Sequence, residues 1–83
     1  MLGTNISQIE VTQVSNQGFW ILLNDEELFL SFENFPWFKD ATVKSLCEIE
    51  WPTPNHLYWP ILNIDLSVES IKNPKDFPLQ YKV

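Results

Sequence analysis

One hairpin constrains the fold of this chain more than any other segment. Residues 19–23, FWILL, and residues 28–32, LFLSF, are apolar runs of strand length, and the turn sequence NDEE at residues 24–27 lies between them. Large apolar side chains stand at consecutive positions in both arms, so each arm is apolar on both of its faces. A strand of this kind needs a cover on each face. The sequence therefore predicts a core on one side of the hairpin and a second contact on the other.

Strand geometry assigns the side chains of the first arm to these two faces. Successive side chains point to opposite sides, so Phe19, Ile21 and Leu23 share one face, whereas Trp20 and Leu22 share the other. The helices predicted for the rest of the chain are too short to cover both faces. We expect the remaining face to be buried against a second copy of the chain, as a homodimer, or against another protein. The alternative is that the chain's own ends fold back over it.

The remaining segments alternate between strand and helix patterns. Three segments have the period of two that is typical of strands: residues 6–14, 47–51 and 56–59. Two segments indicate short helices: residues 41–46, capped by Asp40, and residues 67–72, capped by Ser67. The order of three strands, a helix, two strands and a short helix predicts an α+β fold with a mainly antiparallel sheet. We expect a single domain over residues 1–83, with a loosely held tail at residues 79–83.

Cys47 is expected to be buried and unreactive. It follows Val43 and Leu46 at helical spacing, which predicts one apolar stripe. It also begins an alternation in which Ile49 and Trp51 face inward. Because the chain has one cysteine, no internal disulfide can form. A buried thiol of this kind is inert, since reactivity requires a positive or exposed setting.

A polar surface is predicted on the outer side of the later strands. Glu48 and Glu50 point outward from one strand, and His56 and Tyr58 point outward from the next. We expect His56 or Tyr58 to pair with one of the glutamates across the ladder. Asp65 is expected to face solvent or to bind backbone amides. A cleft beside Asp65 and His56 is the alternative site, for a small ligand or an enzymatic reaction.

The aromatic run FENFPWF at residues 32–38 is a further candidate for a binding surface. Its rings cannot all point inward from so short a segment, and tryptophan is a favoured anchor at protein interfaces. The run either closes the core as a lid or contacts a partner. The candidate partner-binding residues are therefore the following: Trp20, Leu22, Phe29, Phe35, Trp37 and Phe38.

Charge and composition disfavour several classes of function. Eleven acidic residues face five lysines and no arginine, which gives a net charge of −6 at pH 7. Such a chain repels phosphate groups, so we expect no binding to nucleic acid or to an anionic membrane. One histidine and one cysteine are too few for a zinc site, and no glycine-rich loop is present, so no metal or cofactor is expected. Residues 1–20 lack the pattern of a signal peptide, which favours a cytoplasmic location.

Two segments resemble a family of small bacterial proteins, the Domain of Unknown Function family 2442. They are FENFPWFKDATVKSL at residues 32–46 and HLYWPILNIDLSVESIKNP at residues 56–74. The resemblance implies the same α+β order of elements, no enzymatic activity and no catalytic residues. Some relatives resemble the partners in small two-gene modules of the toxin–antitoxin kind. The resemblance therefore implies a non-catalytic, antitoxin-like or regulatory protein that works by binding a protein partner, which the acidic charge predicts to be basic.

Overall fold

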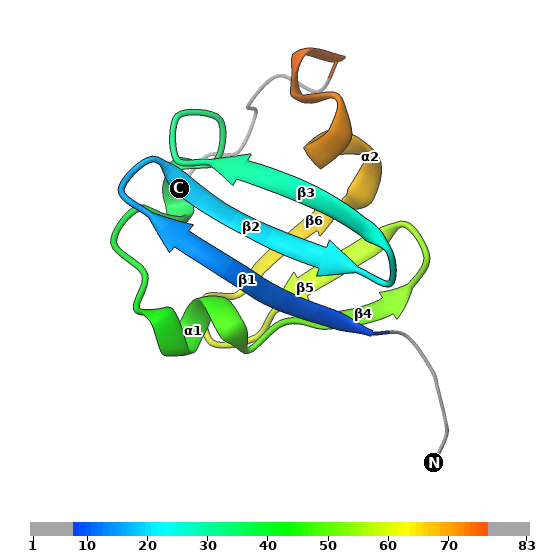
Figure 1. The fold of residues 1–83 in the computed structure, drawn as a ribbon, viewed down its shortest axis with the longest axis horizontal. Helices are drawn as coiled ribbons and strands as arrows, with labels where there is room; N and C mark the ends of the chain where they lie inside the picture. Colours follow the sequence, from blue (N-terminus) through cyan, green and yellow to red (C-terminus); the bar gives the residue numbers. More distant parts are fainter. Residues whose placement is uncertain (1–7, 77–83) are drawn as a thin grey trace.

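The computed structural model describes residues 8–76, which form two three-stranded antiparallel sheets stacked face to face (Figure 1). The first sheet has the strand order β1 (Ile9–Ser15), β2 (Gly18–Leu23), β3 (Glu26–Ser31). The second has the order β4 (Glu50–Thr53), β5 (His56–Trp59), β6 (Ile64–Ser67). The α+β class is confirmed, but the strands form two sheets where the sequence predicted a single, mainly antiparallel one. The predicted tail at residues 79–83 lies outside the described residues.

The predicted hairpin is formed by β2 and β3, with a shorter turn than the sequence suggested. Only Asn24 and Asp25 lie between the strands, so Glu26 and the residue after it belong to β3. Asn24 adopts a φ of 56°, a left-handed conformation that asparagine tolerates better than most residues. The Gln8 N–H donates to Asn24 Oδ1 over 3.2 Å, and the Asn24 N–H donates to the Gln8 carbonyl oxygen over 2.9 Å. Asn24 therefore ties the beginning of β1 to this turn.

The second sheet follows the prediction at β5 and departs from it at β4. β5 has the predicted bounds, and its inward residues Leu57 and Trp59 are fully buried. β4 begins at Glu50 rather than at residue 47, and it includes Pro52, which the sequence assigned to a loop. Proline fits there because β4 is an edge strand, where a missing N–H breaks no ladder. β6 adds a third strand to the predicted pair.

The core lies between the two sheets, and three aromatic rings occupy its centre. Phe19 comes from β2, Phe38 from the short 3₁₀ helix η1 (Pro36–Phe38), and Trp59 from β5. The Phe38 ring centroid lies 5.0 Å from that of Phe19 and 4.7 Å from that of Trp59, in edge-on arrangements that favour aromatic pairs. All three are fully buried. The inner face of the hairpin is therefore covered mainly by the second sheet.

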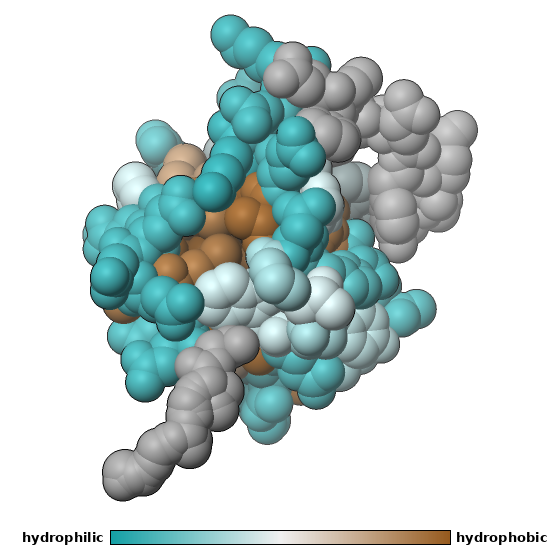
Figure 2. Space-filling model, turned by 90° about the vertical axis from the view of Figure 1, so that its right-hand side faces the viewer, coloured by the Kyte–Doolittle hydropathy of each residue, from teal (hydrophilic) through white to brown (hydrophobic). Residues whose placement is uncertain are grey.

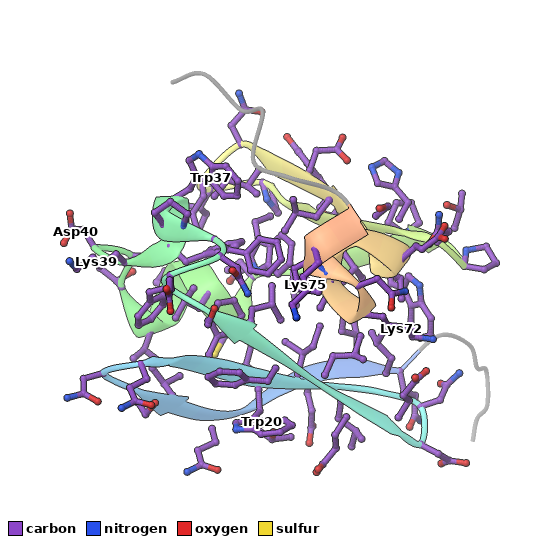
Figure 3. The ribbon with its side chains drawn as sticks, turned by 90° about the horizontal axis from the view of Figure 1, so that it is seen from above. Trp20, Trp37, Lys39, Asp40, Lys72 and Lys75 are labelled. Atoms are coloured by element: carbon purple, nitrogen blue, oxygen red, sulfur yellow. The ribbon has the colours of Figure 1, made fainter. Side chains whose placement is uncertain are left out.

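Two short helices lie between the sheets on opposite sides of the core (Figures 1 and 3). α1 (Val43–Cys47) contacts β1, and α2 (Val68–Lys72) contacts β3 and β6. The predicted cap of the second helix is confirmed, because Ser67 Oγ accepts a hydrogen bond of 3.1 Å from the Ser70 N–H. Lys72 also forms an ion pair of 3.0 Å with Glu26. α2 is therefore joined to β3 by a charged contact as well as by packing.

The predictions for the first helix were partly wrong. α1 begins at Val43, and its cap is Thr42 instead of Asp40, because Thr42 Oγ1 accepts a hydrogen bond of 3.1 Å from the Ser45 N–H. Of the predicted apolar stripe only Leu46 is buried, whereas Val43 is 61% exposed and Cys47 is also exposed. A helix of five residues makes little more than one turn, so it offers one large side chain to the core rather than a stripe.

The side of the molecule shown in Figure 2 has apolar side chains at its centre, surrounded by hydrophilic ones. The apolar core thus approaches the surface between the two sheets, and polar residues border it. This border is typical of a sandwich whose inner faces are apolar and whose outer faces are polar. The outer face of the first sheet departs from that rule.

Candidate functional site

The outer face of the first sheet carries two large aromatic rings in contact with each other. Trp20 on β2 lies directly opposite Phe29 on β3, and their ring centroids are 5.1 Å apart. Trp20 is 37% exposed and Phe29 is 36% exposed. Figure 3 shows Trp20 on the side of the first sheet that points away from the second sheet. The pair therefore contributes to a surface and not to the core.

A second row of residues crosses the same face beside the aromatic pair. Leu22 on β2 lies opposite Glu10 on β1 and opposite Glu27 on β3, so an apolar side chain stands between two acids. Leu22 is half-buried, and both glutamates are exposed. Within residues 8–76 neither glutamate forms an ion pair. We call the surface made by these residues the Trp20 face, and its members are Glu10, Trp20, Leu22, Glu27 and Phe29.

Two hollows adjoin the Trp20 face at its opposite ends. One hollow, of about 630 Å³, lies next to Phe29 and the β1–β2 turn, and both Glu33 and Lys39 line it. The other, of about 440 Å³, lies next to Leu22, and Glu10 and Asn24 line it. The face is therefore not flat, and the two hollows differ in charge, because among the described residues that line them a lysine stands only at the Phe29 end.

The structure separates the six predicted partner-binding residues into two groups. Trp20, Leu22 and Phe29 lie together on the outer face, as strand alternation predicted. Phe35 and Phe38 are in the core, with exposed fractions of 4% and 0%, so for them the alternative of a core lid holds. Trp37 is half-buried, and its ring lies 6.2 Å from that of Phe35. Pro36 begins a 3₁₀ turn in which Phe38 is the buried residue.

Sequence reasoning did not include Glu10 and Glu27 in the candidate surface. Alternation along β1 placed Glu10 on the other face from Ile9 and Val11. It did not show which residue of the neighbouring strand would lie beside Glu10. Glu27 was assigned to the turn, whereas it lies in β3. The two acids flank Leu22 because of the register of three strands, which the turns and the irregularity between Val11 and Gln13 of β1 determine.

The predicted polar surface lies on the outer side of the second sheet. His56 Nε2 and Asp65 Oδ1 form a hydrogen bond, which joins β5 to β6. Tyr58 lies opposite Glu50, as predicted, and its hydroxyl donates to Asn63 Oδ1 over 3.4 Å. Asp65 is exposed to solvent, as one of its two predicted alternatives required, and it binds a side chain rather than backbone amides. Of the two residues predicted to meet a glutamate, Tyr58 does so, whereas the partner of His56 is Asp65.

The other polar candidates are not part of this group. Glu48 lies at the end of α1, where its carboxylate forms an ion pair of 3.6 Å with Lys44. Cys47 is also on α1, whereas His56 is on β5 of the second sheet. In the described part of the chain, no three metal-ligating side chains gather at one place. The His56–Asp65 pair, at 41% and 59% side-chain exposure, faces open solvent.

The architecture is a two-layer α+β fold with an exposed aromatic pair on one outer face. The chain belongs to a family described as proteins of unknown function, DUF2442, whose model matches residues 8–77. Neither the curated proteins nor the solved structures contain a significant match to this chain. The predicted family is therefore confirmed, and membership carries no known activity to this chain.

No helix within residues 8–76 is long and apolar enough to cross a membrane.

Proposed function

We propose that this chain is a non-catalytic protein-interaction module and that the Trp20 face is its docking surface. The observation that carries the proposal is the contact between Trp20 and Phe29, two large rings that are each more than one-third exposed on the side opposite the core. Tryptophan is enriched among the residues that dominate the binding energy of protein interfaces. A pair of exposed aromatic rings beside a leucine is what such an interface needs at its centre.

The charge of the chain supports a basic partner. The net charge is −6, and the two glutamates of the Trp20 face have no ion-pair partner among the described residues. Charges of opposite sign on two proteins speed their encounter and select the correct partner. The same charge disfavours nucleic acids and anionic membranes as partners. The proposed role is that of an antitoxin-like or regulatory subunit in a small two-gene module.

The edges of β4 and β1 are less suited to binding than the Trp20 face. An extended peptide can add to an exposed sheet edge through backbone hydrogen bonds. The edge strand β4 contains Pro52, and the edge strand β1 has an irregular register between Val11 and Gln13. Both features are devices by which proteins prevent pairing at an edge. At these two edges, binding through side chains on a face is therefore favoured over strand addition.

A second candidate function rests on the contact between His56 and Asp65. A histidine bonded to a carboxylate is an arrangement that general bases use. The pair is the one observation that favours a small-ligand site or an enzyme at this end of the second sheet. Its exposure to solvent favours a structural contact across the ladder, since a catalytic pair usually lies in a cleft that excludes water. We therefore place the interaction module first.

We also propose a cytoplasmic location. Cys47 is a free and exposed thiol, and such a residue suits a reducing compartment better than an oxidising one.

Site-specific photo-crosslinking in the native cell tests the proposed docking surface. Replacing Phe29 with p-benzoylphenylalanine puts a photoreactive group on the Trp20 face while keeping an aromatic ring there. Replacing Ile61 in the same way is the matched control, because Ile61 is also apolar and exposed but lies on the turn after β5. We expect a discrete protein adduct from position 29 that position 61 does not give, and we expect Trp20→Ser to abolish it. Equal adducts at both positions, or none at position 29, would contradict the proposal.

A further inference from the structure

The row formed by Glu10, Leu22 and Glu27 gives the Trp20 face a chemical polarity. These residues lie opposite one another on three adjacent strands. Neighbouring strands are about 4.8 Å apart, so the backbones that carry the two glutamates are separated by roughly 10 Å, with Leu22 between them. Trp20 is two residues before Leu22 on the same face of β2. The row thus offers the apolar side chain of Leu22 as a base, with a carboxylate on each side of it. The indole ring of Trp20 lies beside the row, next to Leu22 along β2.

An arginine side chain fits this set of groups. Arginine lays its aliphatic stem along apolar surface and keeps its charged head at the edge, where carboxylates can pair with it. Its planar guanidinium also stacks on aromatic faces, and tryptophan is the best of these. We propose that the occupant of the Trp20 face is a different, basic protein whose arginine side chain lies over Leu22, between Glu10 and Glu27 and against Trp20. This inference rests on the proposed function and names the chemistry of the partner.

A second copy of the chain cannot supply this occupant. The chain contains no arginine. Two of its lysines already form ion pairs with glutamates of the same chain, Lys44 with Glu48 and Lys72 with Glu26. Two-fold pairing through the Trp20 face would also bring an acidic row towards another acidic row, which costs energy. The observations therefore favour a heterologous partner over the homodimer that the sequence left open.

The two ends of the Trp20 face indicate where the arginine lies. The hollow beside Phe29 is lined by Lys39 as well as Glu33, so a cation there meets a like charge. Of the described residues, those that line the hollow beside Leu22 include Glu10 and no lysine. The Leu22 end is therefore the more negative end, and an arriving cation is directed to it.

Peptide display on the intact chain tests the inference without knowledge of the natural partner. The probe is a library of random twelve-residue peptides, selected on the wild-type chain and on two variants that lose the same charge. Glu10→Gln with Glu27→Gln removes the acids of the row. Glu48→Gln with Glu69→Gln removes two exposed acids outside the Trp20 face and is the matched control. Thermal melting of each variant verifies that it is folded before selection.

We expect peptides selected on the wild type and on the control to be enriched in arginine next to apolar residues. Selection on Glu10→Gln with Glu27→Gln should lose this enrichment. For one selected peptide, the affinity should fall about tenfold in that variant, as the loss of two exposed ion pairs implies, and less than about twofold in the control. Replacing arginine with lysine in the peptide should also weaken binding, because the ring contact and the forked geometry are lost.

The outcomes separate this inference from the proposed function. If Trp20→Ser abolishes peptide binding but the selected peptides show no arginine enrichment, the docking surface stands and the arginine subsite is wrong. The heterologous partner is wrong, although the docking surface stands, if the chain forms dimers in analytical ultracentrifugation and position 29 crosslinks to a second copy. If Trp20→Ser leaves peptide binding unchanged, the surface itself is wrong, and so is the subsite.

Discussion

The indole Nε1–H of Trp59 donates a hydrogen bond of 3.1 Å to the carbonyl oxygen of Leu46. The bond joins β5 to α1 at a point where both side chains are buried. Trp59 therefore fills the centre of the core and also satisfies a carbonyl in the last turn of a helix. This combination makes Trp59 the position at which the fold should be most sensitive to substitution.

Two substitutions at Trp59 separate these contributions. We expect Trp59→Ala to lower the free energy of unfolding by about 3–5 kcal/mol, because it leaves a large cavity among Phe19, Phe38 and Leu46. Trp59→Phe keeps a ring but removes the donor, so its cost should be smaller, about 1–3 kcal/mol. Urea unfolding curves provide both values. A Trp59→Ala variant with unchanged stability would mean that Trp59 lies outside the core.

Gly18 should not tolerate a side chain. A Cβ at this position would lie 2.3 Å from the carbonyl oxygen of Leu30 and 2.8 Å from the Cα of Ser31, both of them backbone atoms. The backbone of β3 would have to move, so Gly18→Ala should lower the free energy of unfolding by about 1–3 kcal/mol. Asn16→Ala in the neighbouring turn is the control, and it should change the stability by less than about 0.5 kcal/mol. Equal melting temperatures for the two variants would disprove this close approach.

Cys47 should react with a thiol reagent in the native state. The sequence predicted a buried thiol, but Cys47 is exposed at the end of α1. We expect complete labelling by a disulfide reagent without denaturant, and Cys47→Ser should alter the free energy of unfolding by less than about 0.5 kcal/mol. Labelling that proceeds only as fast as global unfolding would restore the original prediction.

Direct binding to DNA or RNA should be negligible at physiological salt. Few counterions can be released by a chain with a net charge of −6 and no arginine. An electrophoretic shift assay with the purified chain checks this expectation. A salt-dependent shift at micromolar concentration would contradict it.

The strands of the first sheet were predictable because their signal is local. The period of two in β2 correctly assigned Phe19 and Ile21 to the core and Trp20 and Leu22 to the opposite face. The same reasoning assigned Leu57 and Trp59 to the core from β5. In each case a buried sheet face required the pattern that the residues show.

The first helix was less predictable because five residues carry too little periodicity. Asp40 and Thr42 are both acceptable caps, and the sequence alone does not decide between them. The choice of Thr42 begins the helix at Val43, and in the resulting five-residue helix Leu46 is buried whereas Val43 and Cys47 are exposed. The error about Cys47 therefore follows from predicting an apolar stripe on a helix of little more than one turn.

The candidate sites depended on register, which the sequence does not show directly. His56 meets Asp65 because Asn63, at a φ of 56°, shapes the turn that returns the chain as β6. Glu10 and Glu27 flank Leu22 because two turns, together with the register shift between Val11 and Gln13, align three strands. The division of the strands into two sheets was missed for the same reason. Alternation predicts which face a residue occupies, whereas turns decide its neighbours.

A quantitative pull-down tests most directly whether the Trp20 face is a protein-docking surface. The tagged wild-type chain, Trp20→Ser and the control Ile61→Ser are each recovered from the native cell, and bound proteins are measured by mass spectrometry. Trp20→Ser should remain folded, since it loses one exposed cross-strand pair worth about 0.5–1 kcal/mol. We expect at least one protein to be recovered equally by the wild type and Ile61→Ser and to fall at least about tenfold with Trp20→Ser. Equal recovery by all three chains would contradict the account.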